Sequence, residues 1–239
     1  ALHKEMTVKG KTITLTAQIY QWMHEKLASS FDDMTNLSKV LRQKLQDACE
    51  YVSLEKVRVQ ISQIDGTRKY LFRLADGNVI ESVLMRYKHG NSVCISSQVG
   101  CRMGCRFCAS TLDGLERNLR PSEMLDQIYQ IQRDTGERVS NVVVMGSGEP
   151  LDNYDNLIRF IHLLTEEGGL HISQRNVTVS TCGLVPKIRE LADQGLTITL
   201  ALSLHAPNDE VRKSLMPIAR TYALKDVLAA CHYYFEKTG

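Results

Sequence analysis

The sequence predicts an α/β protein, most of it a partial barrel of parallel strands. From Val93 onward, short apolar runs alternate four times with amphipathic helical stretches. Uninterrupted apolar strands between helices are typical of parallel sheets covered by those helices. A helical pattern and then an alternating, turn-rich pattern come before them. We therefore expect a helical module over residues 1–50, an antiparallel β-meander over residues 51–90 and the partial barrel over residues 91–239.

The first fifty residues are expected to be helical. Ile19, Met23 and Leu27 recur at the i+4 spacing of one helix face. A second helix should follow a cap at Thr35 or Asn36. Its apolar face would comprise Leu37, Val40, Leu41 and Leu45.

Residues 54–88 alternate in polarity, as antiparallel strands do. Asp65-Gly66 and Asp76-Gly77 are typical of hairpin turns and divide the stretch into three strands. The alternating apolar positions are Val57, Val59 and Ile61, then Tyr70, Phe72 and Leu74, with the third strand at Val79–Val83. The stretch also carries several basic residues, namely Arg68, Lys69, Arg73, Arg86 and Lys88. They fit a solvated face and a phosphate-binding face equally well.

Four strand–helix units make up the predicted barrel. The strands are expected at Val93–Ser97, Val142–Met145, Val177–Ser180 and Thr197–Leu204. The helices are expected at Pro121–Asp134, at Tyr154–Glu166, from Pro186 to Gly195, and at Leu224–Lys237. In barrels of this kind, the chemistry gathers at the C-terminal ends of the strands.

Composition excludes some classes of protein. The apolar fraction of 43% supports a sizeable core, and no apolar run is long enough to span a membrane. A net charge of +2 does not by itself indicate nucleic-acid binding. The seven cysteines, three of them clustered, fit reduced cytosolic thiols better than a disulfide framework. We therefore expect a cytoplasmic protein.

Cys101, Cys105 and Cys108 form a Cys-x3-Cys-x2-Cys triplet in a loop after the first barrel strand. Gly100 and Gly104 flank the first two cysteines, where the backbone must fold tightly. A structural zinc site needs four ligands, and no second cysteine pair follows. Three thiolates suit a [4Fe–4S] cluster that leaves one iron open. The alternative, three cysteines that are merely close, is disfavoured by the spacing and the glycines.

The ends of the other barrel strands carry small and polar residues. They are Gly146-Ser147-Gly148-Glu149-Pro150, Ser180-Thr181-Cys182-Gly183 and Ser203-Leu204-His205. Such residues at successive strand ends indicate a binding site rather than core packing. Together with the triplet, they resemble the radical S-adenosylmethionine (SAM) superfamily. SAM needs close backbone approach, polar partners for its ribose and an apolar wall for its adenine.

Over almost its whole length the chain resembles the RlmN/Cfr family of radical SAM adenine methyltransferases, and the RlmN branch more closely. The resembling segments are QIYQWMHEK, SVCISSQVGCRMGCRFCAS, GLERNL, VVVMGSGEPLDNYDN, NVTVSTCGLVPKIRELA, LALSLHAPND and LMPIAR. The resemblance implies a partial (βα)6 radical SAM barrel. It also implies an enzyme that methylates carbon 2 of an adenine in 23S rRNA, at the peptidyl-transferase centre, and in the tRNA anticodon loop.

The resemblance assigns roles to single residues. Cys101, Cys105 and Cys108 match the ligands of the [4Fe–4S] cluster. The SAM contacts would be Phe107, Gly148, Glu149, Ser180, Ser203, Leu204 and His205. Glu81 matches a proposed proton acceptor, and Cys94 matches a cysteine that resolves an RNA–protein adduct. Cys182 and Cys231 are expected to be packing residues, although Cys182 lies near the barrel mouth.

The mechanism that the resemblance implies uses two SAM molecules. One methylates an enzyme cysteine, and the other, cleaved at the cluster, activates that methyl group for addition to the adenine. A base then removes the carbon-2 proton, and Cys94 closes a disulfide that releases the RNA. We therefore expect Cys94 to be partly exposed, near the cluster and basic groups. The target adenine must leave its stack to reach the site. Flavodoxin or ferredoxin is the expected type of electron donor.

The sequence departs from the family pattern at its C-terminal end. The cysteine that carries the methyl group belongs to a segment after Gly239, so we expect this sequence to be a C-terminally truncated fragment. Three other functions stay open: a Cfr-type carbon-8 methyltransferase conferring antibiotic resistance, an iron–sulfur RNA-binding protein without turnover, and a radical SAM enzyme with another substrate. The residues of the segments GEPLDNYDN and STCGLVP are similar to those of RlmN and disfavour the Cfr-type activity. Glu81, Cys94 and the basic meander disfavour the last.

Overall fold

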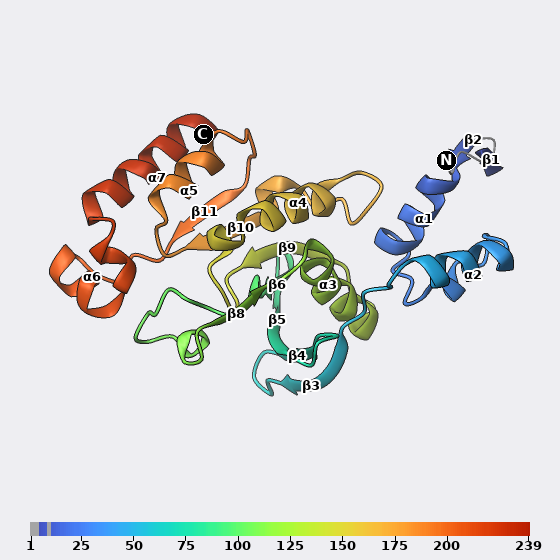
Figure 1. Cartoon of the computed structure of the whole chain (residues 1–239), viewed down its shortest axis with the longest axis horizontal. Helices are drawn as coiled ribbons and strands as arrows, with labels where there is room; N and C mark the ends of the chain where they lie inside the picture. Colours follow the sequence, from blue (N-terminus) through green and yellow to red (C-terminus); the bar gives the residue numbers. More distant parts are fainter. Residues whose placement is uncertain (1–4, 9–10) are drawn as a thin grey trace.

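A seven-stranded mixed sheet forms the centre of the computed structural model, which describes residues 5–8 and 11–239. Its strand order is β11-β10-β9-β6-β5-β4-β3 (Figure 1). The strands are β3 Glu55–Ile61, β4 Arg68–Arg73, β5 Val79–Tyr87, β6 Gly90–Ile95, β9 Val139–Val144, β10 Val177–Thr181 and β11 Thr199–Leu202. β6, β9, β10 and β11 run parallel, which confirms the predicted α/β fold.

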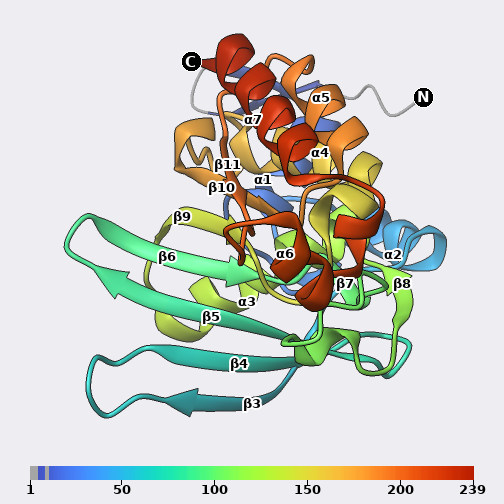
Figure 2. The same ribbon diagram turned by 90° about the vertical axis from the view of Figure 1, so that its left-hand side faces the viewer.

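The meander and the barrel share this one sheet. β3, β4, β5 and β6 pair antiparallel in sequence order and lie side by side (Figure 2). In the β5–β6 pair, Val83 lies opposite Cys94 and Leu84 lies opposite Val93. The sheet therefore continues across residue 90, where the sequence predicts a division between two domains.

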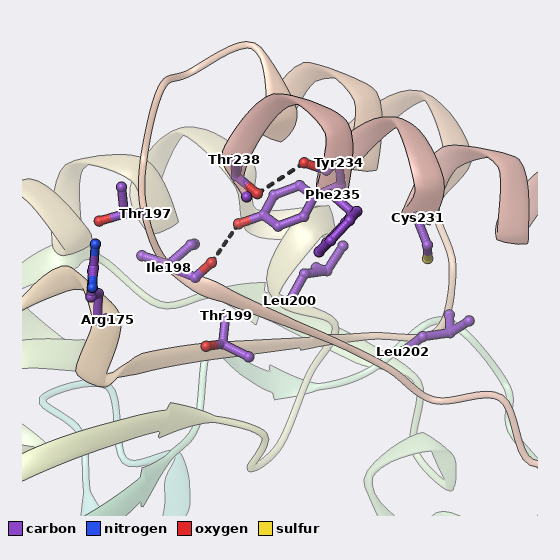
Figure 3. Close-up of a pocket in the computed structure, with 11 residues that line it drawn as sticks. Arg175, Thr197, Ile198, Thr199, Leu200, Leu202, Cys231, Tyr234, Phe235 and Thr238 are labelled. Atoms are coloured by element: carbon purple, nitrogen blue, oxygen red, sulfur yellow. Dashed lines mark hydrogen bonds between the residues drawn. The ribbon is translucent and has the colours of Figure 1, made fainter.

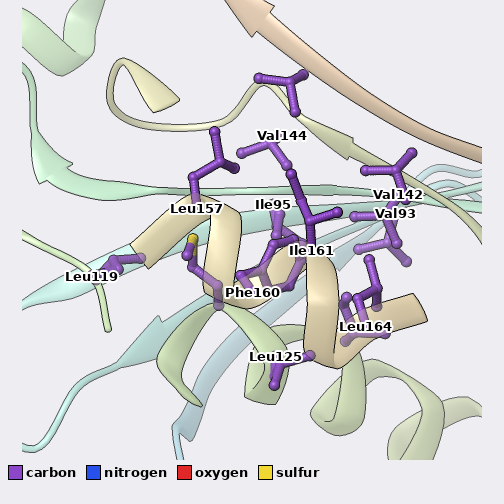
Figure 4. Packing of buried hydrophobic residues seen from close by; sticks show 14 of the residues in the cluster. Val93, Ile95, Leu119, Leu125, Val142, Val144, Leu157, Phe160, Ile161 and Leu164 are labelled. Carbon is purple, nitrogen blue, oxygen red and sulfur yellow. The ribbon is translucent and has the colours of Figure 1, made fainter. Parts of the chain in front are cut away.

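Helices cover one face of the sheet and enclose the main core. They are α3 Pro121–Thr135, α4 Tyr154–Thr165, α5 Val185–Ala192 and α7 Leu224–Thr238, whereas α6 Asp209–Leu215 contributes no residue to this core. Figure 4 shows the contact between α4 and the strands: Leu157, Phe160, Ile161 and Leu164 pack against Val93, Ile95, Val142 and Val144. All eight side chains have no solvent exposure. The predicted strand–helix units are thus present, and α6 is an addition that the sequence analysis missed.

The N-terminal prediction is only partly right. α1 Leu15–His24 and α2 Lys39–Ala48 are helices, but β1 Glu5–Val8 and β2 Lys11–Thr14 form an antiparallel hairpin. A helical assignment is wrong there because this segment is rich in β-branched residues, which favour strands. Residues 1–4 and 9–10, also assigned to the helical module, lie outside the described residues. Figure 1 shows α1 and α2 at the opposite end of the molecule from α6 and α7.

The predicted cap and apolar face of the second helix also need correction. Ser38 is the cap of α2, because its Oγ accepts a hydrogen bond from the Leu41 backbone N–H at 3.3 Å. Neither Thr35 nor Asn36 takes this place. Val40 is 68% exposed, whereas Leu41 and Leu45 pack against the small core formed by Leu15, Ala28, Phe31, Met34 and Leu37.

The first meander strand does not bury its alternating apolar face. Val57 is 40% exposed and Ile61 is 50% exposed, because β3 is the edge of the sheet and its register shifts between Lys56 and Arg58. In contrast, Tyr70, Phe72 and Leu74 are buried in the main core as expected. The two predicted hairpin turns are confirmed between β3 and β4 and between β4 and β5.

Most of the basic residues of the meander pair with carboxylates. Arg68 and Lys56 bind Asp134, Arg86 binds Glu137, Arg73 binds Glu55 and Lys69 binds Glu81. These pairs favour a structural role for the charges over a phosphate-binding one. In the part of the chain that the structure describes, no helix has the length and apolarity needed to cross a membrane.

Candidate functional site

A cavity of ≈ 320 Å³ lies at the C-terminal ends of the parallel strands. Cys101, Cys105 and Cys108 all line it. So do six of the residues that the sequence analysis assigned to SAM, namely Phe107, Gly148, Glu149, Ser180, Ser203 and His205. Leu204 does not line the cavity, and its backbone carbonyl accepts a hydrogen bond from Arg212 Nε at 3.3 Å. The fold thus brings nine of the predicted residues to one place.

A short ribbon fixes the base of the cysteine loop. β7 Gln98–Gly100 and β8 Leu115–Asn118 pair antiparallel on either side of it. The Cys101 N–H donates to the Gly114 carbonyl at 2.8 Å. Gly100 has a φ of 72°, and a Cβ added there would lie 2.0 Å from that same carbonyl oxygen. Only glycine therefore permits this closure of the loop.

Inside the loop, Thr111 holds the backbone of two of the cysteines. Its Oγ1 lies 3.2 Å from the Cys105 carbonyl and 2.9 Å from the Cys108 carbonyl. The Cys108 N–H also donates to the Cys105 carbonyl at 3.1 Å. These contacts position the last two cysteines of the triplet on one wall of the cavity.

The loop after β9 contributes backbone and a buried carboxyl group to the lining of the cavity. Gly148 has a φ of 103°, and a Cβ there would lie 2.5 Å from Gln98 Cβ. The buried Gln98 side chain accepts from the Glu149 N–H at 2.8 Å. The Glu149 carboxylate accepts from the Cys182 N–H at 2.8 Å and the Leu151 N–H at 3.1 Å. Burial raises the pKa of Glu149, and these hydrogen bonds oppose that rise.

Aromatic and hydroxyl groups complete the lining. The Phe107 and His205 rings are in contact, with centroids 4.5 Å apart, and Phe107 is 52% exposed. His205 has a φ of 54°, in the left-handed region. The Ser180 and Ser203 hydroxyl oxygens lie 3.3 Å apart. An apolar wall with a few polar groups is typical of sites for small organic cofactors.

Two thiols of the triplet, Cys101 and Cys105, are held in the neutral form by their surroundings. Burial raises the pKa of Cys101 to about 11 and also raises the pKa of Cys105. A bound metal centre would favour the thiolate forms, because coordination deprotonates thiols. Within residues 5–8 and 11–239, no three His, Cys, Asp or Glu side chains form a preformed cage for a metal ion. Three thiols around one cavity fit a larger inorganic cluster with one open position.

Glu81 and Cys94 lie on the sheet and do not line the cavity. Glu81 and Val83 are two residues apart in β5, and Val83 lies opposite Cys94, so all three occupy the same face. Glu81 is half-exposed and pairs with Lys69 Nζ at 2.7 Å. Cys94 is partly exposed, next to the backbone of Met145, which lines the cavity.

The surroundings of Cys94 differ from the expectation of nearby basic groups. Burial raises the pKa of the Cys94 thiol, and a backbone hydrogen bond at Met145 opposes the rise only in part. In the described part of the chain, no basic side chain is among the groups that shift the pKa of Cys94. The expected basic surroundings therefore do not contribute to the pKa of Cys94.

Several residues of the site were not singled out from the sequence. Ser96 Oγ donates to the Glu81 carbonyl at 2.7 Å and accepts from the Ser147 N–H at 3.0 Å. Asn153 Nδ2 donates to the Ser97 and Leu119 carbonyls at 2.9 and 2.8 Å. The polar run Ser96-Ser97-Gln98 follows an apolar strand, so the strand-end argument could have found it. Cys182, expected to be a packing residue, lines the cavity.

A larger cavity of ≈ 580 Å³ lies between β11 and α7 (Figure 3). Tyr234 hydroxyl donates to the Ile198 carbonyl at 2.7 Å along its wall. The lining includes one cysteine, Cys231, and no acidic side chain. It gathers no set of reactive groups comparable with the smaller cavity, which we take as the candidate site.

Comparison with known proteins identifies two family matches. Residues 95–238 match the family model of the radical SAM superfamily. Residues 10–51 match the ribosomal RNA large subunit methyltransferase N-terminal domain. Together the two matches include the helices α1 and α2 and the parallel strands β9, β10 and β11.

The similar proteins are all named as methyltransferases. A probable dual-specificity RNA methyltransferase RlmN from Lachnospira eligens is 73% identical over 93% of this chain and 63% of its own length. One from Lachnoclostridium phytofermentans is 62% identical over 100% of this chain and 67% of its own length. The crystal structure of a radical SAM methyltransferase from Sphaerobacter thermophilus superposes with a TM-score of 0.88 and 44% identity, covering 93% of this chain and 66% of that one. The chain thus spans about two thirds of the length of these relatives.

Proposed function

Because the chain belongs to the radical SAM superfamily and, within it, to the RlmN family, we propose that it acts in the SAM-dependent methylation of an adenine in RNA. The position methylated is carbon 2, and the substrates are 23S rRNA and tRNA. The relatives named dual-specificity RNA methyltransferases support two RNA substrates. The observation that carries the proposal is the cavity lined by all three cysteines of the triplet.

Different residues around this cavity bind the cluster and SAM. Cys101, Cys105 and Cys108 would hold a [4Fe–4S] cluster, because three thiolates leave one of its irons open for SAM. When bound, the cluster and SAM supply the one-electron chemistry that an electron-poor ring carbon requires. A flavodoxin or ferredoxin is the proposed type of electron donor.

Other lining residues orient the cofactor. Phe107 and His205, in ring contact at 4.5 Å, flank its adenine. The hydroxyl groups of Ser180 and Ser203 bind its ribose from the ends of two neighbouring strands. The glycine at position 148 leaves the backbone open to close approach. The buried Glu149 carboxyl group, fixed by two backbone N–H groups, sets the depth of the site.

The face of the sheet beside the cavity suits the RNA base. Glu81 and Cys94 share that face. In the proposed reaction Glu81 accepts the proton that leaves carbon 2, and Lys69, 2.7 Å away, fixes the carboxylate. The Cys94 thiolate would then attack the sulfur of the methyl-carrying cysteine: an S–S bond forms, the bond from that sulfur to the methylene carbon on the adenine breaks, and this carbon takes up a proton as the methylated RNA leaves. The adenine reaches this face only after it has left its stack.

Anaerobic reconstitution with iron and sulfide tests the proposal. The protein should bind about four irons and four sulfides per chain and, once reduced, should cleave SAM to 5′-deoxyadenosine. Cys101→Ser should lose both properties. Cys49→Ser should keep both, because Cys49 is exposed and far along the chain from the triplet. A colourless or zinc-containing native protein would contradict the cluster assignment.

The position of methylation needs a separate measurement. Nucleoside mass spectrometry of rRNA and tRNA from a strain that lacks the gene, before and after complementation, should show 2-methyladenosine restored. Recovery of 8-methyladenosine would assign a Cfr-type carbon-8 activity instead. SAM cleavage without either product would assign another substrate.

A further inference from the structure

Arg212, on α6, is a buried charge without a matching carboxylate. Its side chain has no solvent exposure. In the described part of the chain, no acidic group lies within salt-bridge distance of it, and its Nη1 atom has no hydrogen-bond partner. The other donors bind backbone carbonyls: Nη2 binds Cys182 at 2.6 Å and Nε binds Leu204 at 3.3 Å. A buried cation of this kind is costly unless opposite charge lies close by.

The guanidinium does not itself line the cysteine-lined cavity, but it binds a residue that does. Cys182, to which it donates, lines that cavity, and the Cys182 N–H in turn binds the Glu149 carboxylate at 2.8 Å. Cys105, Cys182 and Met216 form one buried cluster, and Met216 follows directly after α6. A Cβ added at Gly183 would lie 3.3 Å from Nη2. The charge is therefore packed between the strand ends and the triplet.

The same helix also holds the cysteine loop. The Leu215 carbonyl, at the end of α6, accepts from the Arg106 N–H at 2.9 Å, and Arg106 lies between two cysteines of the triplet. The helix that carries the buried charge of Arg212 is thus the one that holds this loop in place.

We propose that Arg212 is the buried counter-charge of the cofactor site, offsetting the negative charge of Cys101, Cys105 and Cys108 when these thiolates hold the cluster. The inference rests on the proposed function. Arg212 touches neither the thiolates nor the cavity, so it is a positioning residue. Because reduction would add negative charge to a bound cluster, a fixed cation near the cavity would favour the reduced state. The residue therefore sets how readily the site accepts its electron.

The test is a redox titration of the reconstituted protein, followed by electron paramagnetic resonance. Arg212→Gln removes the charge and keeps an amide donor, whereas Arg212→Lys keeps the charge and loses the planar fork. Lys213→Gln removes one positive charge from the exposed side of the same helix as a control. Arg212→Gln should lower the equilibrium constant for one-electron reduction about tenfold, equivalent to ~59 mV. Arg212→Lys and Lys213→Gln should keep the wild-type potential.

The outcomes separate this inference from the proposed function. A wild-type protein that binds no cluster would overturn both. A loaded wild-type protein whose potential is unchanged by Arg212→Gln would overturn the inference alone. If the glutamine variant does not fold, Arg212→Met takes its place and should lower the potential to the same extent, and an unchanged potential there would overturn the inference. The lysine variant keeps the charge and should keep the wild-type potential. A tenfold or larger shift in that variant would assign the effect to the carbonyl hydrogen bonds and overturn the proposal.

Discussion

At the scale of single residues, burial and not charge governs the thiols near the site. Burial raises the pKa of Cys94, and it raises the pKa of Cys101 to about 11. Thiolates are the reactive form, so both side chains are protected from electrophiles at neutral pH. Cys49, at the end of α2, is exposed and open to reagents in solution.

Alkylation kinetics should reveal this difference. In the cluster-free protein at pH 7, iodoacetamide should modify Cys94 on the order of tenfold more slowly than Cys49. The rate at Cys94 should keep rising as the pH passes 9.0, the ordinary thiol value, because its own pKa lies above it. Peptide mass spectrometry at timed intervals measures both rates in one sample. Equal rates at pH 7 would contradict the protected environment.

Gly148 tests the contribution of close packing to the cavity. Gly148→Ala forces a Cβ to within 2.5 Å of Gln98 Cβ, and the backbone φ of 103° adds strain. Binding of SAM to the reconstituted protein should weaken at least about tenfold, as equilibrium dialysis would show. Gly77→Ala is the matched control, because Gly77 has a φ of 88° and nothing within 4 Å of an added Cβ. If both variants bind SAM equally well, the clash does not reach the cavity.

At the scale of elements, Arg117 of β8 forms ion pairs with both the hairpin turn before β5 and the helix α3. It pairs with Asp76 in the turn before β5 and with Glu123 in the first turn of α3. The hydrogen bond from Arg117 lowers the pKa of Asp76 to about 2. A depressed carboxyl pKa stabilises the fold above the ordinary value of 3.8, and this stabilisation is lost as the pH falls toward 2.

Asp76→Asn should therefore destabilise the protein only when the carboxylate is ionised. Because the pair is partly exposed, the loss at pH 7 should be about 0.5–1 kcal/mol. Urea unfolding at several pH values measures it, and the wild-type and variant curves should converge near pH 2. Asp113→Asn, an exposed change in the cysteine loop, should have no such effect. A pH-independent loss would assign the effect to turn geometry.

Long elements could be predicted from the periodicity of their apolar residues, whereas short elements could not. α3 and α4 have several turns of clear periodicity, and the parallel strands are apolar runs, so both were predicted from the sequence. β1, β2, β7 and β8 have only three or four residues each, too few for a pattern. In α6 the pattern is reversed: Val211 is 40% exposed and Arg212 is fully buried. Only the tertiary environment of the cysteine loop accounts for that inversion.

The candidate site was predictable to the same degree. The triplet and the strand-end residues are local in sequence, so their gathering follows from parallel topology. The sequence could not predict which of the three consecutive residues Ser203, Leu204 and His205 face the cavity. Alternation of side-chain direction along the chain decides this, and Leu204 does not line the cavity. Likewise, the pairing of Lys69 with Glu81 depends on the register between β4 and β5.

At the scale of the whole molecule, the N-terminal helices contact the outer helices of the barrel through a few polar groups. Tyr20 hydroxyl donates to Glu166 at 2.7 Å, and His24 Nδ1 lies 2.5 Å from the Tyr129 hydroxyl. His24 is largely buried at this contact, and burial lowers its pKa, while Glu166 acts in the opposite sense. The neutral form of His24 therefore belongs to the packed arrangement.

This arrangement should weaken in mild acid. A histidine whose pKa is lowered by folding stabilises the structure above its ordinary value of 6.5, and that contribution is lost as the pH falls below it. Hydrogen exchange in α1 should accordingly be faster at pH 5.5 than at pH 7.5, after correction for intrinsic rates. His24→Gln cannot take up the proton, so its corrected exchange in α1 should not depend on pH. His162→Gln, on the exposed face of α4, should behave as the wild type does. Equal corrected rates in the wild type at both pH values would mean that the contact at Tyr129 tolerates a charged imidazole, and that the apolar core around Phe31 and Met34 holds α1 in place without it.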